Sequence, residues 1–344
     1  MKLPTPRKLP SGSWNIQIRI DGQSYSITKP TAKACTKEAM ALKSGAKEAR
    51  RKSNMTVAKA IDDYIRNREN ILSPSTIRGY RAIARTRFKT SMQWDIAAAT
   101  PDQWQRAVNQ EARLCSAKTL KNAWGFIFCV LKNEGMTVEV ITPKVPKAER
   151  LWLTPEQIKV FVKAVAGKPC EIPALLALHS LRRSEIAGLT WDNIDLEKGT
   201  ITVSGSAVID EHNEVVSKAT NKPDSSTRIV RIVIPELLDK LLAEEDKTGS
   251  VYKGYINSPY YAINKVCEAN GLPKVGIHGL RHSFASLGYH LRMSEMEVMR
   301  IGGWSDFETV RKIYTHLSQL DETKAANKME QFYRENSVSK SVSK

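Results

Sequence analysis

The sequence has few cysteines, no long apolar run and a shortage of acidic residues. Its five cysteines are odd in number and scattered, and no Cys-x-x-Cys pair occurs, so neither a zinc knuckle nor a disulfide framework is indicated. We expect reduced thiols in a cytosolic protein. No apolar run approaches the ~18 residues of a membrane span, and the first residues hold no hydrophobic signal region. We therefore expect no membrane partner.

The shortage of acidic residues is uneven along the chain. Lysine and arginine number 53 against 36 aspartates and glutamates, a formal net charge of +17. Residues 1–53 hold twelve basic and three acidic residues and residues 54–150 hold sixteen and nine, whereas residues 151–344 hold twenty-five and twenty-four. Such a surplus indicates a polyanionic partner such as nucleic acid. Two small basic segments therefore precede a larger, nearly neutral one. This arrangement is expected of DNA-binding domains attached to a domain with a different function.

The first segment predicts a small β-hairpin followed by a helix. Apolar and polar residues alternate from Trp14 to Ile20, and Asp21-Gly22 suits a tight turn. We expect two strands over residues 14–29, with a third strand as an open alternative, and a helix over residues 31–52.

The second segment predicts an all-helical unit over residues 55–140. Apolar residues recur at helical spacing in residues 55–70, 72–89 and 116–135. Arginines of the second helix recur at three- and four-residue spacing, which places them on one face. With two lysines of the third helix they are candidates for contacts to DNA phosphates, a solvated surface being the alternative: Arg78, Arg81, Arg85, Lys118 and Lys121.

The last segment follows an extended linker over residues 141–150. A helix is predicted to begin at Thr154 as N-cap, with Pro155 at the first helical position and Gln157 completing a capping box. We expect further elements in this order: a helix at 171–179, strands within 200–209 and 227–234, mainly helices over 235–335, and a disordered polar tail at 336–344. The fold class is therefore multidomain and mainly α with small β-sheets (α+β).

Four short pieces of the last segment combine unusual polar residues. None is specific alone, since an isolated His-x-x-Arg on a helix is common. They are LRRSEIAGLTWDNID (181–195), NKPDSSTRIVRI (221–232), HGLRHSFASLGYHL (278–291) and IGGWSDFETVRKIYTHL (301–317). In this order and at these separations they resemble the tyrosine recombinase family, in particular phage-type integrases.

The resemblance covers residues 150–335, which it identifies as a mixed α/β tyrosine-recombinase catalytic domain. More weakly, it extends to residues 1–53 as an arm-type DNA-binding domain and to residues 54–145 as an all-α core-binding (SAM-like) domain. It implies an enzyme that cleaves and rejoins DNA strands through a 3′-phosphotyrosyl intermediate, to integrate or excise a phage or mobile element. It implies no metal ion, ATP or other cofactor.

Such a reaction explains the residue types. A tyrosine hydroxyl attacks a backbone phosphate, and covalent storage of the phosphodiester removes the need for ATP. Negative charge builds on the phosphoryl oxygens in the transition state, and without a metal it must be neutralised by fixed cations. Guanidinium groups suit this task because they are planar, always charged and able to bind two oxygens at once.

The resemblance assigns roles to residues of the two arginine motifs. In LRRSE, Arg182 is the first phosphate-binding arginine, and Glu185 supports it from the same helical turn. In HGLRHSF, His278 and Arg281 lie on one helix face. Arg281 is the second phosphate-binding arginine, His278 assists proton transfer, and His282 has a supporting, structural role.

The remaining roles fall on the other two pieces. A hairpin lysine in a Lys-x-x-Ser-x-x-Arg-like context is implied as general acid, which Lys222 fits, with Lys218 as the alternative. Where the family often has a second histidine this chain has Trp304, whose indole N–H donates hydrogen bonds but cannot act as acid or base. Ten residues on, Tyr314 is the expected nucleophile.

The resemblance also implies partners. Family members act as homotetramers on two DNA duplexes that carry attachment sites, and an excisionase and host DNA-bending proteins are further candidates, all in the cytoplasm of a bacterial host. An amphipathic helix expected over residues 321–335 would pack either on a neighbouring subunit or on its own domain. The alternatives to an integrase are a Xer-like resolvase, a type IB topoisomerase-like enzyme and a non-catalytic sequence-specific DNA-binding protein.

Overall fold

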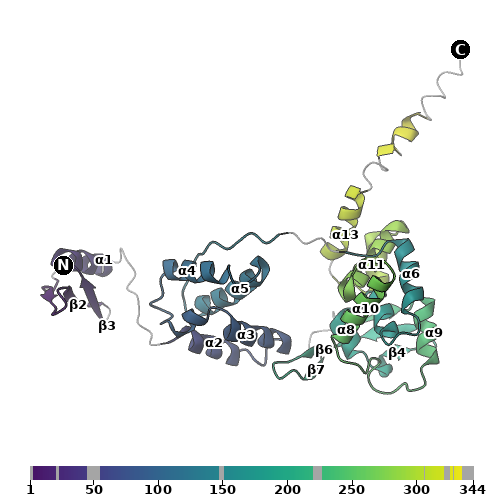
Figure 1. The fold of residues 1–344 in the computed structure, drawn as a ribbon, viewed down its shortest axis with the longest axis horizontal. Coiled ribbons are helices and arrows are strands. Elements are labelled where there is room, and N and C mark those ends of the chain that lie inside the picture. The colour runs from purple at the N-terminus through teal and green to yellow at the C-terminus, as the bar shows by residue number, and fades with distance from the viewer. Residues whose placement is uncertain are drawn as a thin grey trace, which may run out of the picture. The chain divides into compact units, whose positions relative to one another are not determined.

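The structure is a computed structural model, and Figure 1 shows its elements. It describes residues 3–20, 23–44, 55–146, 151–219, 227–305, 307–320, 326–327 and 329–334. The chain divides into two compact units, Met1–Ile71 with Tyr80–Pro146 and Leu72–Gly79 with Lys147–Lys344. This division places the first two predicted domains in one unit, so the three-domain organisation stays a prediction.

The N-terminal part is a three-stranded antiparallel sheet with one helix packed on it. Its elements are β1 (Arg7–Lys8), β2 (Trp14–Ile20), β3 (Gln23–Lys29) and α1 (Ala32–Lys43), with β2 in the middle of the sheet. The alternation of apolar residues buries Ile16, Ile18 and Ile27 in a small core that includes residues of α1. The predicted hairpin is confirmed, and the third strand, which the sequence left open, is present as β1. The turn residues 21–22 lie outside the described part of the chain.

The second part is helical, as predicted, and contains a helix that sequence analysis missed. Its elements are α2 (Val57–Arg66), α3 (Pro74–Thr86), the 3₁₀ helix η1 (Lys89–Gln93), α4 (Pro101–Glu111) and α5 (Ala117–Asn133). The missed helix is α4, which begins with a capping box formed by Thr100 and Gln103. It carries the fully buried Trp104, whose ring lies against those of Phe88 and Trp124.

The C-terminal part combines helices with two small sheets. The helices are α6 (Pro155–Val165), α7 (Glu171–Leu178), α8 (Arg183–Gly188), η2 (Trp191–Asn193), α9 (Pro235–Ala243), α10 (Ser258–Ala269), α11 (Gly276–His290), α12 (Glu295–Gly302) and α13 (Phe307–Leu320). The strands are β4 (Ile194–Asp195), β5 (Thr200–Val203), β6 (Gly205–Ile209), β7 (Val215–Ala219) and β8 (Arg228–Arg231). Strands β4, β5 and β8 form one antiparallel sheet, and β6 and β7 form a hairpin.

The buried helix α7 anchors this part of the chain. Nearly all of its side chains are buried, and it packs against α11 and α9 within the main apolar core. The predicted capping box of α6, formed by Thr154 and Gln157, is present. The predicted fold class, mainly α with small β-sheets, is confirmed. None of the described helices is both long and apolar enough to cross a membrane.

Candidate active site

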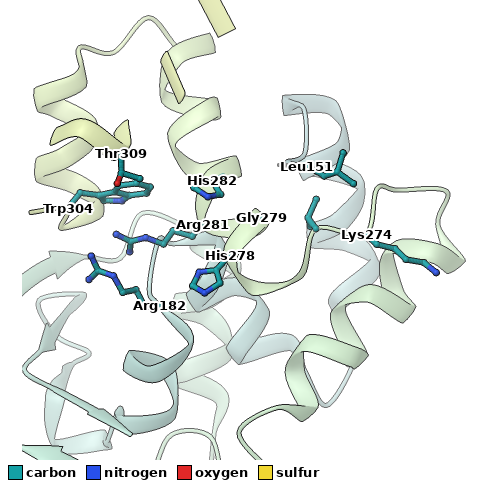
Figure 2. Close-up of a pocket in the computed structure, with 10 residues that line it drawn as sticks. Leu151, Arg182, Lys274, His278, Gly279, Arg281, His282, Trp304 and Thr309 are labelled. Atoms are coloured by element: carbon teal, nitrogen blue, oxygen red, sulfur yellow. The ribbon is translucent and has the colours of Figure 1, made fainter. Parts of the chain in front are cut away.

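One pocket of about 580 Å³ brings together predicted residues from three segments of the chain. Arg182 comes from the junction of α7 and α8, His278, Arg281 and His282 come from α11, and Trp304 follows α12. In Figure 2 the guanidinium groups of Arg182 and Arg281 lie next to each other below the Trp304 ring. The pocket therefore presents two neighbouring cations and an indole to whatever enters it.

Arg281 is a cation held in an unusual environment. Its side chain is only 5% exposed, and its guanidinium carbon lies 4.0 Å from the centre of the Trp304 ring, in a cation–π contact. Burial, followed by the charge of Arg182, lowers the pKa of Arg281 to about 9, so the group remains charged at neutral pH. Its Nη1 is buried without a hydrogen-bond partner among the described residues. A bound anion would satisfy both the charge and this donor.

Glu185 links Arg182 to a third arginine. The backbone N–H of Arg182 donates to Glu185 Oε2 at 2.8 Å, and Arg182 Nη1 donates to Oε1 at 2.7 Å, so the two residues are in contact as expected. Arg228 Nη1 and Nη2 donate to the same two oxygens at 3.0 and 2.8 Å. Burial acts to raise the pKa of Glu185, but the hydrogen bonds and charges of Arg228 and Arg182 outweigh it and lower this pKa to about 2.

Sequence analysis gave Arg228 no role of its own. Arg228 is the arginine of the Lys-x-x-Ser-x-x-Arg pattern that begins at Lys222, so the sequence did contain a signal for it. As the first residue of β8 it pairs with Val203 of β5, which fixes its backbone. Its side chain runs beneath Gly303, where an added Cβ would collide with it. The contact with Glu185 depends on this packing, which no local pattern reveals.

The two glycines before Trp304 hold the indole in place. Gly303 adopts a left-handed conformation with φ of 61°, which ends α12. A Cβ on Gly302 would lie 2.7 Å from the Trp304 ring and 2.8 Å from the Phe284 ring. The hydroxyl of Ser180, two residues before Arg182, donates to the carbonyl of Gly302. The turn that carries Trp304 is thereby tied to the segment that carries Arg182.

Tyr314 lies on α13 and is not among the residues that line this pocket. Its hydroxyl donates to the backbone carbonyl of Met293 at 3.0 Å, and its ring lies edge-on to that of Tyr289 with 5.4 Å between centroids. Burial, aided by the charges of Glu295 and Glu297, raises the pKa of Tyr314 to about 12. The structure therefore brings together the two arginines and the tryptophan but leaves the predicted nucleophile protonated and outside their pocket.

The two lysine candidates cannot be placed in this pocket. Lys222 lies outside the described residues, and of Lys218 only the backbone is described, opposite Ser206 in the β6–β7 hairpin. His282 lines the pocket and is half-buried, whereas His278 is exposed at its edge.

The predicted DNA-contacting residues lie on α3 and α5. Arg78 and Arg85 are exposed, while Arg81 is engaged with Asp62 at 2.6 Å. Lys118 and Lys121 line a pocket of about 520 Å³ between these two helices, together with the stacked rings of Tyr80 and Phe126. These basic residues therefore lie at the surface of the helical part of the chain.

Comparison with known proteins shows that this chain is similar to recombinases and integrases. Residues 151–320 match the model of the phage integrase family. The tyrosine recombinase XerD of Neisseria meningitidis serogroup B is 26% identical over 72% of this chain and 89% of the relative. The integrase of Salmonella phage P22 is 26% identical over 55% of this chain and 49% of the relative. A XerC-like tyrosine recombinase of Caldanaerobacter subterraneus is 25% identical over 59% and 60%, which is less than two thirds of its length.

Solved structures show the same fold. The Tn1549 transposon integrase in complex with transposon right end DNA superposes with a TM-score of 0.62 at 17% identity, over 80% of this chain and 99% of that one. The lambda integrase tetramer bound to a Holliday junction gives a TM-score of 0.56 at 16% identity, over 90% and 94%. Residues 151–320, which hold both arginines, the tryptophan and the tyrosine, are therefore a phage integrase family domain, and the chain is similar to tyrosine recombinases and phage integrases.

Proposed function

We propose that this chain is a site-specific DNA recombinase that integrates or excises a phage or other mobile element through a 3′-phosphotyrosyl intermediate. The observation that carries the proposal is the pairing of Arg182 and Arg281 in one pocket of a phage integrase domain. Arg281 in particular has a buried donor and a depressed pKa, and a phosphate oxygen would relieve both.

Each group has a role in the cleavage step. The Tyr314 oxygen attacks the phosphorus, the bond from phosphorus to the 5′-oxygen breaks, and a proton from Lys222 neutralises the leaving oxygen. Arg182 and Arg281 bind the phosphoryl oxygens, where charge builds in the transition state. His278 assists removal of the tyrosine proton. Trp304 Nε1 is buried without a hydrogen-bond partner among the described residues. In the complex with DNA it donates to a phosphoryl oxygen.

Attack requires Tyr314 to leave its position against α11 and α12. Its hydroxyl must exchange the Met293 carbonyl for the phosphate, and its pKa of about 12 must fall as it does so. Two neighbouring guanidinium groups supply the positive environment that lowers a phenol pKa. Movement of α13 is therefore part of the proposed reaction.

The partners follow from the reaction. Double-stranded DNA with attachment sites is the substrate, contacted by the basic residues Arg78, Arg81, Arg85, Lys118 and Lys121 among others. Exchange of four strands needs four active sites, so we propose a homotetramer, and we retain an excisionase and host DNA-bending proteins as further partners. The segments 1–53, 54–145 and 150–335 act as arm-type, core-binding and catalytic domains in this proposal.

A nicked suicide DNA substrate that contains the recombination site tests the nucleophile. The wild-type protein should accumulate a covalent protein–DNA adduct, because loss of the short nicked strand prevents religation. Tyr314→Phe should form none while it still binds the DNA, and Tyr289→Phe, which removes the hydroxyl of the neighbouring ring, is the matched control and should retain the adduct. An adduct that persists in Tyr314→Phe contradicts the assignment.

A Xer-like resolvase is the second candidate, favoured by the XerD relative, of which the match covers 89%. The two functions differ in the DNA beside the gene. An integrase is expected next to an attachment-site repeat that the protein recombines in vitro, whereas a resolvase should recombine two copies of one site on a multimeric chromosome or plasmid.

A further inference from the structure

Glu185 is a buried carboxylate whose hydrogen-bonding capacity is filled. Its side chain is 9% exposed, and each oxygen accepts two hydrogen bonds, one from Arg182 and one from Arg228. A buried carboxylate must be neutralised, since an unpaired one is strongly unfavourable. The two arginines therefore pair with a single negative charge. How strongly each one pairs with it determines which guanidinium N–H groups stay available to a ligand in the pocket.

The two arginines contribute unequally. Arg228 is 18% exposed and gives Glu185 two parallel side-chain hydrogen bonds, the bidentate geometry in which a guanidinium group pairs most strongly with a carboxylate. Arg182 is 42% exposed, lines the pocket and gives only Nη1 from its side chain. The remaining N–H groups of the Arg182 side chain are thus not committed to Glu185.

The backbone and side chain of Arg228 are both held in place next to Glu185. Its backbone pairs within the β5–β8 sheet, and its side chain is confined beneath Gly303, directly before Trp304. It therefore contacts both Glu185 and the turn that carries the indole, while it is not among the residues that line the pocket.

We propose that Arg228 is a positioning residue for strand cleavage: it neutralises Glu185 and so leaves the Arg182 guanidinium group available to the scissile phosphate. The inference rests on the strand-cleavage function proposed above. Without Arg228, the Glu185 carboxylate would draw Arg182 into bidentate pairing and away from the DNA. This role differs from a simple packing role. Arg228 would no longer be needed for positioning Arg182 if Glu185 carried no charge, whereas its packing contacts would still matter.

That difference defines the experiment. Single-turnover cleavage of the suicide substrate is measured for the wild type, Arg228→Gln, Glu185→Gln and the double variant. Arg228→Gln should slow adduct formation by roughly 100-fold, as expected when a catalytic group is displaced by about 1 Å, while the dissociation constant for site DNA changes less than about threefold. In the double variant cleavage should recover by about tenfold over Arg228→Gln, because no carboxylate remains to capture Arg182.

Two further variants serve as controls. Arg228→Lys can keep the charge but not the bidentate geometry, so its rate should fall between those of the wild type and Arg228→Gln. Arg231→Ala removes an exposed arginine from the same strand and should leave the rate within about threefold of wild type. Thermal unfolding shows whether each variant is folded. If Arg228→Gln is not folded, Arg228→Lys with and without Glu185→Gln replaces it in the comparison.

The outcomes are distinct. The positioning role would be overturned if the folded double variant cleaves no faster than Arg228→Gln, or if the losses in cleavage free energy of the two single variants simply add in the double variant. The proposed wild-type cleavage would be unaffected by that result. Failure of the wild-type protein to form a Tyr314-dependent adduct would instead remove the proposed function, and with it this role for Arg228.

Discussion

At the scale of single residues, Glu185 imposes a pH dependence on stability. A carboxyl whose pKa is about 2 in the folded chain and ~4.3 when unfolded contributes stability that is present above pH ~4.3 and lost as the pH falls through about 2. The shift corresponds to about 3 kcal/mol. We expect the free energy of unfolding, measured with urea, to fall more steeply between about pH 5 and pH 2 in the wild type than in Glu185→Gln. Parallel curves for the two proteins would contradict this prediction.

Trp304 offers a second test at this scale. Because the indole cannot transfer a proton, its contribution must come from hydrogen bonding and from packing on Arg281. A histidine can also donate a hydrogen bond and lie over a guanidinium group, so Trp304→His should keep substantial strand cleavage, within about tenfold of wild type. Adduct formation on the suicide substrate measures this, with Arg281→Ala as the reference for complete loss. A loss in Trp304→His as severe as in that reference would refute the idea.

Some parts of the site could be predicted from the sequence, and others only the structure reveals. The resemblance to a known family assigned Arg182, Arg281 and Trp304 to one site, and the structure places all three around one pocket. The partnership of Arg228 with Glu185 joins residues 43 positions apart and depends on strand pairing and on Gly303. The position of Tyr314 could not be predicted either, since it depends on how α13 packs, and no motif encodes that packing.

At the scale of elements, Gly288 sets how closely α11 approaches α12 and α13. A Cβ at this position would collide with Val298 and come within 3.1 Å of the Tyr314 hydroxyl. Gly288→Ala should therefore destabilise the protein by about 1–3 kcal/mol, as overpacking of a close-packed contact does. Chemical denaturation measures the change. Gly205→Ala is the control, because its Cβ would meet only one atom, at 4.0 Å, and it should change stability by less than about 1 kcal/mol.

Elements with strong local signals were the ones predicted correctly. The capping box predicted Thr154 as the start of α6, and strict alternation predicted β2. Helix α4 was missed although it has the same kind of capping box at Thr100, because its polar residues obscure the apolar period. Strand β7 was missed because it pairs with β6 across a turn, residues 210–214, that has no glycine to mark a hairpin. Tertiary pairing, rather than local preference, makes this segment a strand.

At the scale of the whole molecule, helical residues beyond α13 expose three large apolar side chains. Met329, Phe332 and Tyr333 are 59%, 58% and 62% exposed, and their spacing places them on one face of a helix. An apolar face of this kind favours association, either with a neighbouring subunit of the proposed tetramer or with its own domain, and we expect the first. We therefore expect this segment to couple strand exchange to assembly.

Truncation after Leu320 tests that coupling. Recombination between two full sites should fall by at least about tenfold, because the linkage between subunits is lost, whereas adduct formation on a single half-site should stay within about threefold of wild type. In the full chain, Phe332→Ser with Tyr333→Ser should reproduce the defect. Arg334→Ala, which removes only an exposed ion pair with Glu330, should not. Recombination unchanged by the truncation would mean that the apolar face packs on its own subunit or has no part in exchange, and control of Tyr314 would then have to act through α12 and α13 alone.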